Sequence, residues 1–267
     1  FWQCRFFHMG VLGNTLEEIA YEKIGIAKKD IPVFTTETRE VVLDVFSDYC
    51  AKVSAKLIIC DYKEIKNPSF KEEGMCFTYK GQELSIPMLG FHQIKNALLA
   101  IKIYEYLMDL GKTPVKNEYI YNGLKKAKWS GRLEIIRHKP LVIIDGSHNI
   151  DGVITLVASM KYFINKGYII HTVFAALKDK ESGNMLGLLQ SISETLTLTS
   201  FDFYRANTAK NLYEQTNKIK VFYEEDYLKV LNNKITAINE KELLLVTGSL
   251  YFISHVIRYF KALDKER

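Results

Sequence analysis

A carboxylate, an imidazole and an amide stand close together in the segment Asp145-Gly146-Ser147-His148-Asn149. The segment directly follows the apolar run 140–144, which has the composition of a buried strand. These are side chains of the kind that bind ligands and transfer protons. Asp-Gly is also a common turn dipeptide, because glycine accepts a positive φ and aspartate bonds to nearby backbone. By itself, the segment favours an ordinary turn and leaves a ligand loop as the alternative.

Lys23 is the second candidate, because it interrupts the apolar face of a predicted helix. Thr15 followed by Glu18 is a capping box, which predicts a helix over 16–24. Apolar residues occupy positions i, i+3, i+4 and i+8 of that helix, and Lys23 stands at i+7. Either the lysine extends to water at the helix end near Gly25, or it is partly desolvated. In the second case its pKa falls and its amine becomes reactive.

The remaining side chains of metal-binding type are scattered. His8 stands alone, and a lone histidine is more often structural or exposed than a ligand. The four cysteines form no CxxC pair and have no histidine at zinc spacing: Cys4, Cys50, Cys60 and Cys76. The sequence thus predicts neither a zinc site nor a disulfide framework, and it favours a reducing compartment.

The elements that must position these residues alternate between strand-like and helix-like segments. Before residue 127 we expect helices at 16–24, 39–54, 92–110 and 115–126, and strands at 32–35, 57–61, 75–79 and 83–87. After it we expect strands at 133–137, 141–145, 168–174, 198–204, 219–222 and 242–247, with helices near 152–164, 182–193, 208–216, 226–239 and 250–262. This order predicts an α/β fold with a mostly parallel sheet covered on both faces. Ligands of such sheets bind at the carboxyl ends of the strands, which is where 145–149 would lie.

Composition limits the classes of partner. The chain has 267 residues and a formal net charge of +5, without the basic blocks typical of a nucleic-acid surface. No apolar stretch approaches the roughly 20 residues that a membrane span needs. We therefore expect an intracellular protein that binds neither nucleic acid nor membrane, while an anionic small-molecule substrate fits the charge.

Six short blocks, in order along the chain, resemble the folylpolyglutamate synthase/dihydrofolate synthase family of the Mur ligase superfamily. They are His8-x-x-x-Leu12-Gly13-x-Thr15 continuing to Ile19-Ala20-x-Glu22-Lys23-x-Gly25-Ile26, His92-Gln93-Ile94-x-Asn96-Ala97, Trp129-Ser130-Gly131-Arg132-Leu133-Glu134, Asp145-Gly146-Ser147-His148-Asn149, Ala176-Leu177-x-Asp179-Lys180 and Val246-Thr247-Gly248-Ser249-Leu250-Tyr251. Any one block is weak, whereas six in order at compatible spacing are specific.

The resemblance implies an ATP-dependent acid–amino-acid ligase that adds L-glutamate to a folate or pteroate through an acyl phosphate. It implies ATP and Mg²⁺ as cofactors, a monomer, and a cytoplasmic location, or an organelle such as the mitochondrion in a eukaryote. Residues 1–127 would be the later part of a P-loop-type ATPase domain. Residues 128–267 would be the smaller Rossmann-like α/β carboxyl-terminal domain.

The same resemblance assigns roles to individual residues. His8 would be a magnesium ligand, and Lys23 would be a carbamylated, catalytic lysine beside the metal. Asn96 would contact the nucleotide base, and Arg132 would reach the ATP phosphates. Asp145 would bind the nucleotide with His148 beside it, so that segment 145–149 contributes to an ATP site in an interdomain cleft.

Three features depart from the family pattern. Phe7 stands where the family has Asp, and Ile24 stands where Ala is usual. No G-x-x-G-K-[ST] phosphate loop occurs in the sequence, so we expect the chain to be the later part of a longer protein. Two alternatives stay open: a Mur-type ligase acting on peptidoglycan precursors, and a non-catalytic nucleotide-binding remnant.

Overall fold

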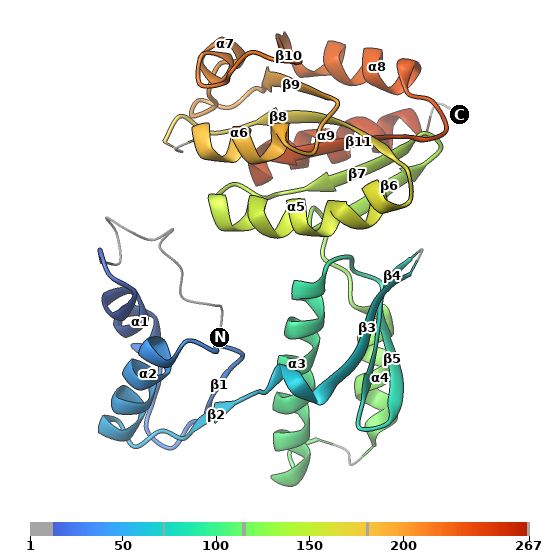
Figure 1. Ribbon diagram of the computed structural model, residues 1–267. Helices are drawn as coiled ribbons and strands as arrows, with labels where there is room; N and C mark the ends of the chain where they lie inside the picture. Colours follow the sequence, from blue (N-terminus) through green and yellow to red (C-terminus); the bar gives the residue numbers. More distant parts are fainter. Residues whose placement is uncertain (1–12, 72, 114–115, 180–181, 266–267) are drawn as a thin grey trace. The chain divides into compact units, whose positions relative to one another are not determined.

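The computed structural model describes residues 13–71, 73–113, 116–179 and 182–265 (Figure 1). They form two compact units. Unit 1 holds the described residues up to Pro87 together with Phe91–Ala127, and unit 2 holds Met88–Gly90 and the chain from Lys128 onward. Each unit has a core of its own and is described by itself.

The first half of unit 1 packs two helices against a short parallel strand pair. The elements are α1 (Leu16–Ile24), β1 (Val33–Thr35), α2 (Glu40–Lys52) and β2 (Leu57–Ile59). The predicted capping box is present at the start of α1. The Glu18 N–H donates to Thr15 Oγ1, and the Glu18 carboxylate accepts a hydrogen bond from the Thr15 N–H. Ile19, Ala20 and Ile24 of α1 are buried against α2, as the apolar stripe predicts.

The second half of unit 1 is a three-stranded antiparallel sheet with two helices. A 3₁₀ turn (Tyr62–Glu64) leads into β3 (Ile65–Lys71), β4 (Gly74–Tyr79) and β5 (Gln82–Ile86), followed by α3 (Phe91–Asp109) and α4 (Asn117–Lys126). The Lys80-Gly81 turn between β4 and β5 is confirmed, with positive φ at both residues. Gly111 ends α3 as predicted, at a φ of 66°. The predicted helix opening at Pro114 lies outside the described residues.

Unit 2 is built on one six-stranded sheet in the order β10-β9-β8-β11-β7-β6. The strands are β6 (Glu134–His138), β7 (Leu141–Asp145), β8 (Ile169–Ala175), β9 (Thr195–Ser200), β10 (Val221–Asp226) and β11 (Glu242–Gly248). All neighbours pair in parallel except β6 with β7. The last strand, β11, lies between β7 and β8, so the first and last parallel strands are neighbours.

Helices cover both faces of this sheet, as the sequence predicts. They are α5 (Ile150–Asn165), α6 (Gly183–Gln190), α7 (Ala209–Tyr213), α8 (Tyr227–Ala237) and α9 (Leu250–Leu263). Figure 1 shows α5 and α6 on one side and α8 and α9 on the other. Val142, Ile144 and Val246 face the α8–α9 side and share its core, and the residues between them point to the opposite side. Both α/β character and a mostly parallel sheet are confirmed.

Three strands differ from the sequence prediction. The strand β3 was not expected, because it carries Pro68 and a bulge between Lys66 and Ser69 and lies at a sheet edge. The predicted strand 198–204 is wrong in its second half: β9 ends at Ser200, and the aromatic residues that follow form a loop. Aromatic side chains favour strands, but here they stack on one another, with the rings of Phe201 and Phe203 6.1 Å apart. The strand predicted at 219–222 is Val221–Asp226.

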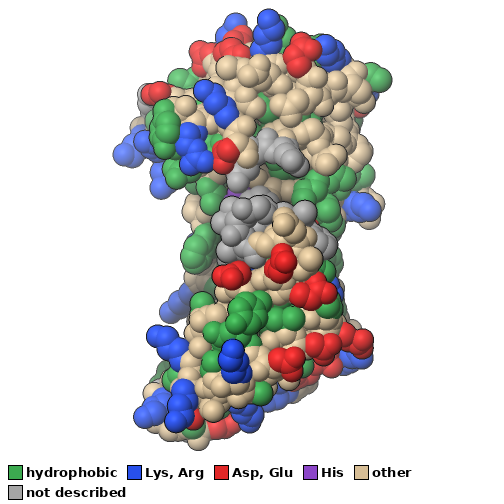
Figure 2. All heavy atoms as spheres, turned by 90° about the vertical axis from the view of Figure 1, so that its left-hand side faces the viewer, with side chains coloured by type: hydrophobic (Ala, Val, Ile, Leu, Met, Phe, Trp, Pro, Cys, Tyr) green, Lys and Arg blue, Asp and Glu red, His purple; other side chains and the backbone are tan. Residues whose placement is uncertain are grey.

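Charge is distributed unevenly over the surface. Figure 2 shows acidic side chains gathered over α1 and α2, where six carboxylates are exposed: Glu17, Glu18, Glu22, Glu40, Asp44 and Asp48. The net positive charge of the chain is therefore not a property of this face. Among the described residues, no helix is both long enough and apolar enough to cross a membrane.

Candidate functional site

Three of the blocks singled out in the sequence meet at the carboxyl edge of the six-stranded sheet. In the strand register Thr247 of β11 lies opposite both Asp145 of β7 and Phe174 of β8, and Gly248 lies opposite Ala175. The loops after β7, β8 and β11 therefore begin side by side. A fourth block, 129–134, joins them through a backbone hydrogen bond of 2.8 Å from Gly146 N–H to the Gly131 carbonyl.

Asp145 is a buried carboxylate held by backbone donors. Asp145 is only 5% exposed to solvent. The backbone N–H of Leu133 donates to Oδ2 at 2.8 Å, and that of Ser147 donates to Oδ1 at 2.9 Å. Burial raises the pKa of Asp145 above its ordinary value, against the opposing effect of the hydrogen bonds from Ser147 and Leu133 and of the Arg132 charge. Asp145 thus ties the end of β7 to the turn that precedes β6.

That turn presents Arg132. Glu134 organises it by accepting hydrogen bonds of 2.8 Å from both the Ser130 hydroxyl and the Gly131 N–H. Gly131 and Leu133 on either side of the arginine have positive φ values of 76° and 43°. A left-handed leucine is an uncommon backbone state that needs support, and the bond from Leu133 N–H to Asp145 supplies it. Arg132 itself is partly buried.

His148 and Asn149 lead from β7 into α5. His148 Nδ1 lies 2.9 Å from the Gly146 carbonyl oxygen, which only accepts, so Nδ1 carries the proton in that bond. Asn149 is the N-cap of α5, and its Oδ1 accepts from Gly152 N–H at 2.7 Å. Residues 146–149 form a short loop rather than the expected Asp-Gly turn, since Gly146 has no positive φ. This loop places an imidazole at the edge where the loops converge.

The loop after β11 approaches β8 closely. A Cβ on Gly248, whose φ is 125°, would come within 2.0 Å of the Ala175 carbonyl oxygen, so this position requires glycine. Beside it the Thr247 side chain is fully buried, and its Oγ1 has no hydrogen-bond partner among the described residues. Ser249 caps α9 by accepting from Tyr251 N–H at 3.3 Å.

The candidates of unit 1 occupy two different elements. Lys23 is partly buried in the last turn of α1, at the border of the apolar stripe. Asn96 is exposed near the start of α3, where its Nδ2 donates to Gln93 Oε1 at 2.9 Å. His8 lies outside the described residues. Within the described ranges no three histidine, cysteine or acidic side chains cluster in a way that could hold a metal ion.

Sequence reasoning gave no role to two acidic residues that the structure shows to be organising groups. Glu134 shapes the Arg132 turn; in the sequence it is visible only as the last residue of the block 129–134, which gave it no role. Glu37, after β1, is 3% exposed and pairs with Arg39 at 2.6 Å. Burial raises the pKa of Glu37, but hydrogen bonds from Arg39 and from the backbone of Thr38 and Arg39, with the arginine charge, outweigh it and lower that pKa from 4.5 to about 2.

Comparison with known proteins agrees with this arrangement. Residues 131–250, which contain the loops after β7, β8 and β11, match the family described as "Mur ligase, glutamate ligase domain". The dihydrofolate synthase/folylpolyglutamate synthase of Bacillus subtilis is 37% identical over 261 residues, or 95% of this chain and 60% of that protein. The chain is a homologue of the folylpolyglutamate and dihydrofolate synthases.

Other members of this group support the same relationship. The folylpolyglutamate synthase of Lacticaseibacillus casei is 28% identical and matches 93% of the chain and 58% of its own length. Among solved structures, E. coli FolC in complex with ADP aligns with a TM-score of 0.79 at 23% identity, over 97% of this chain and 60% of that one. These structures show the shared fold. The chain spans about 60% of the length of the Bacillus subtilis and Lacticaseibacillus casei proteins.

Proposed function

We propose that this chain is part of an ATP-dependent ligase that joins L-glutamate to a folate or pteroate carboxylate through an acyl phosphate. The observation that carries the proposal is the convergence of four family-like blocks at one edge of the unit 2 sheet. These blocks are distant in sequence, and the fold brings them together at the edge where α/β sheets bind ligands. The names of the homologous synthases support the same activity.

In this proposal unit 2 contributes charge and orientation. The guanidinium of Arg132 neutralises the charge of the phosphate oxygens. Glu134 and Asp145 hold the turn that carries this arginine and so fix its position. Asp145 acts first as the anchor of that turn, and its remaining acceptor capacity is available to a hydroxyl of the nucleotide. His148, fixed by its bond to the Gly146 carbonyl, lies beside the phosphates as a polar contact. Bound ATP supplies the phosphoryl group that turns a poor leaving oxygen into a good one.

Unit 1 would contribute the remaining groups of a P-loop-type ATPase domain. Lys23, carbamylated, would supply an anionic oxygen for Mg²⁺ together with His8, and Asn96 would contact the base. Lys23 is partly buried at the border of the apolar stripe of α1, and a carbamate there would replace a cation by an anion. The described residues hold no complete metal site of their own, and the residues proposed to bind Mg²⁺ are Lys23 and His8. We further propose a cytoplasmic monomer.

Ligation assays test the activity. Labelled L-glutamate should be incorporated in the presence of ATP and Mg²⁺ when dihydropteroate or tetrahydrofolate is the acceptor, and not when the acceptor is a nucleotide-linked muramyl acid. Incorporation into the muramyl acid alone would replace the proposal by a peptidoglycan ligase, and nucleotide binding without any incorporation would replace it by a binding protein.

Lys23 has its own test. Lys23→Ala should lose activity that added short carboxylates partly restore, because a free carboxylate can occupy the place of the carbamate. Lys28→Ala, an exposed lysine just beyond the same helix, is the matched control and should retain full activity. An inactive Lys23→Ala that no carboxylate restores would remove the carbamate from the proposal.

A further inference from the structure

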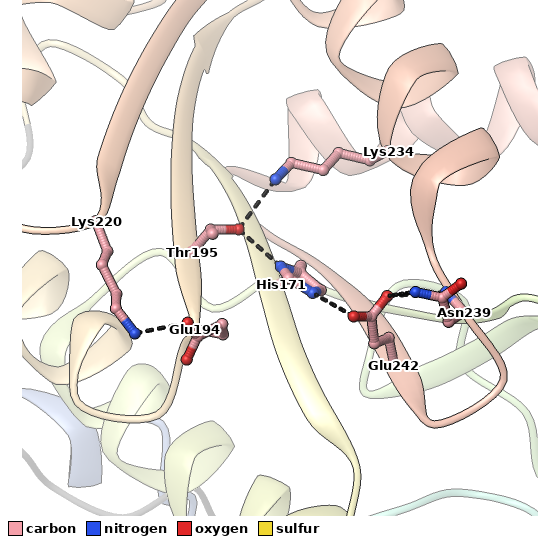
Figure 3. A network of polar contacts seen from close by, with 7 residues as sticks. All are labelled: His171, Glu194, Thr195, Lys220, Lys234, Asn239 and Glu242. Atoms are coloured by element: carbon pink, nitrogen blue, oxygen red, sulfur yellow. Dashed lines mark hydrogen bonds and ion pairs between the residues drawn. The ribbon is translucent and has the colours of Figure 1, made fainter.

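A second polar cluster lies at the opposite edge of the unit 2 sheet, at the amino ends of the strands (Figure 3). It contains His171 of β8, Thr195 at the start of β9, Glu242 at the start of β11 and Lys234 of α8. In the register His171 pairs with Thr195, and Glu242 pairs with Ile169. Parallel strands put their carboxyl ends at the other edge, so this cluster is separate from Asp145 and its loops.

Its members form a continuous chain of polar contacts. Lys234 Nζ donates to Thr195 Oγ1 at 3.0 Å, and Thr195 Oγ1 lies 2.8 Å from His171 Nδ1. His171 Nε2 lies 3.6 Å from Glu242 Oε1, while Glu242 Oε2 accepts from Asn239 N–H at 2.8 Å. In the neutral tautomer with its proton on Nε2, towards the carboxylate, Nδ1 accepts from the Thr195 hydroxyl. The directions of the bonds then run from the lysine through the threonine to the histidine.

The environment of Lys234 differs from that of the other lysines on this part of the surface. Desolvation lowers the pKa of Lys234, and the nearby Glu242 only partly offsets it. Lys229, five residues earlier on α8, is exposed and pairs with Glu224 at 2.5 Å. That pairing raises the pKa of Lys229. At the border of the cluster, Lys220 pairs with Glu194 at 2.6 Å.

We propose that Lys234 is a nucleophilic amine and a site of covalent N-acylation by small acyl phosphates, with Thr195 and His171 as its proton acceptors. The ammonium proton passes to Thr195 Oγ1 as the hydroxyl proton passes to His171 Nδ1. The Nζ lone pair then attacks the acyl carbon, a C–N bond forms, and the C–O bond to phosphate breaks. Inorganic phosphate leaves with the electron pair, and the second amine proton goes to solvent. The product is an amide that carries no charge.

The test is site-resolved acetylation of the whole chain with acetyl phosphate at pH 7.5, followed by peptide mapping at low total modification. Lys229 on the same helix is the internal reference. Lys234 should be acetylated faster than Lys229, on the order of tenfold for each unit by which its pKa is the lower. Lys234→Arg should remove the modified peptide and leave labelling of Lys229 unchanged. A Lys234 labelled no faster than Lys229 would overturn the proposal.

Two substitutions separate the hydrogen-bonded route from burial alone. Thr195→Val keeps the shape of the side chain but removes the hydroxyl that links Lys234 to His171, and His171→Gln removes the base at the end of this hydrogen-bonded path. Both substitutions should lower the acetylation rate of Lys234 towards that of Lys229. Thr195→Ser keeps the hydroxyl and should retain the fast rate, and circular dichroism checks that each variant is folded. Fast labelling of Lys234 in folded Thr195→Val and His171→Gln would refute the role of the route.

Discussion

The hydrogen bonds of Asp145 make a quantitative prediction for Asp145→Asn. The amide has the shape of the carboxylate but offers one acceptor oxygen, so either Leu133 N–H or Ser147 N–H would face an NH₂ group. Losing a charge-assisted bond in a site that is 5% exposed costs about 1.5–3 kcal/mol, and weakening the second costs about 1 kcal/mol more. Relief of the buried charge, seen in the raised pKa, offsets part of this. We expect the free energy of unfolding of unit 2 to fall by about 2–3 kcal/mol.

Urea unfolding followed by circular dichroism measures this loss, and amide hydrogen exchange locates it. Protection should fall first at the amides of Leu133 and Ser147, because Asp145 is their acceptor. Asp202→Asn is the control: Asp202 is exposed in the loop after β9, and its substitution should change stability by less than about 0.5 kcal/mol. If Asp145→Asn unfolds like the Asp202 control and exchange at Leu133 is unchanged, the carboxylate does not anchor the turn.

The remaining predictions concern backbone space, an acid-labile anchor and the proposed phosphate contact. Gly248→Ala should destabilise unit 2 by more than about 3 kcal/mol in a thermal melt, because its Cβ would meet a backbone oxygen at 2.0 Å; Gly187→Ala, with open space in α6, should be neutral or stabilising. Glu37→Gln should cost unit 1 on the order of 2–3 kcal/mol at pH 7, since the carboxylate is buried and its pKa is lowered to about 2. Because the folded pKa lies below the unfolded value, this contribution is present above about pH 4.5 and disappears as the pH falls towards 2, so wild type and variant should converge in acid urea melts. Arg132→Lys in the ligase should lower kcat at least tenfold with folding intact, since a lysine does not reproduce the forked guanidinium; unchanged turnover would remove Arg132 from the phosphate site.

Much of the fold could be predicted because local signals and tertiary structure agree. The capping box at Thr15, the hairpin glycine at Gly81 and the stop at Gly111 each act within a few residues, so the sequence contains all the partners they need. The apolar runs of β7 and β11 predicted strands buried on both faces for the same reason. Prediction failed at β3 and at the end of β9, where a bulge and an aromatic stack override local preference.

The candidate site was predictable as a set of residues and not as an arrangement. The segment 145–149 could be placed at the end of a strand, and Arg132 could be assigned by resemblance. Asp145 accepts one backbone hydrogen bond at each carboxylate oxygen, and Glu134 shapes the turn that carries Arg132. Both contacts depend on the pairing of β6 with β7 and on the positive φ of Leu133. No periodicity in the sequence records such a pairing.

The sequence by itself determined the succession of helices and strands, the local caps and turns, and the identity of the groups able to do chemistry. Only the tertiary structure decided which of them meet. The chain returns after β10 to insert β11 between β7 and β8, which brings Thr247 beside Asp145 at one edge and Glu242 near His171 at the other. The order of the strands is set by contacts between segments that are distant in sequence, because both faces of the sheet must be buried at once. Local residue preferences carry no information about these contacts.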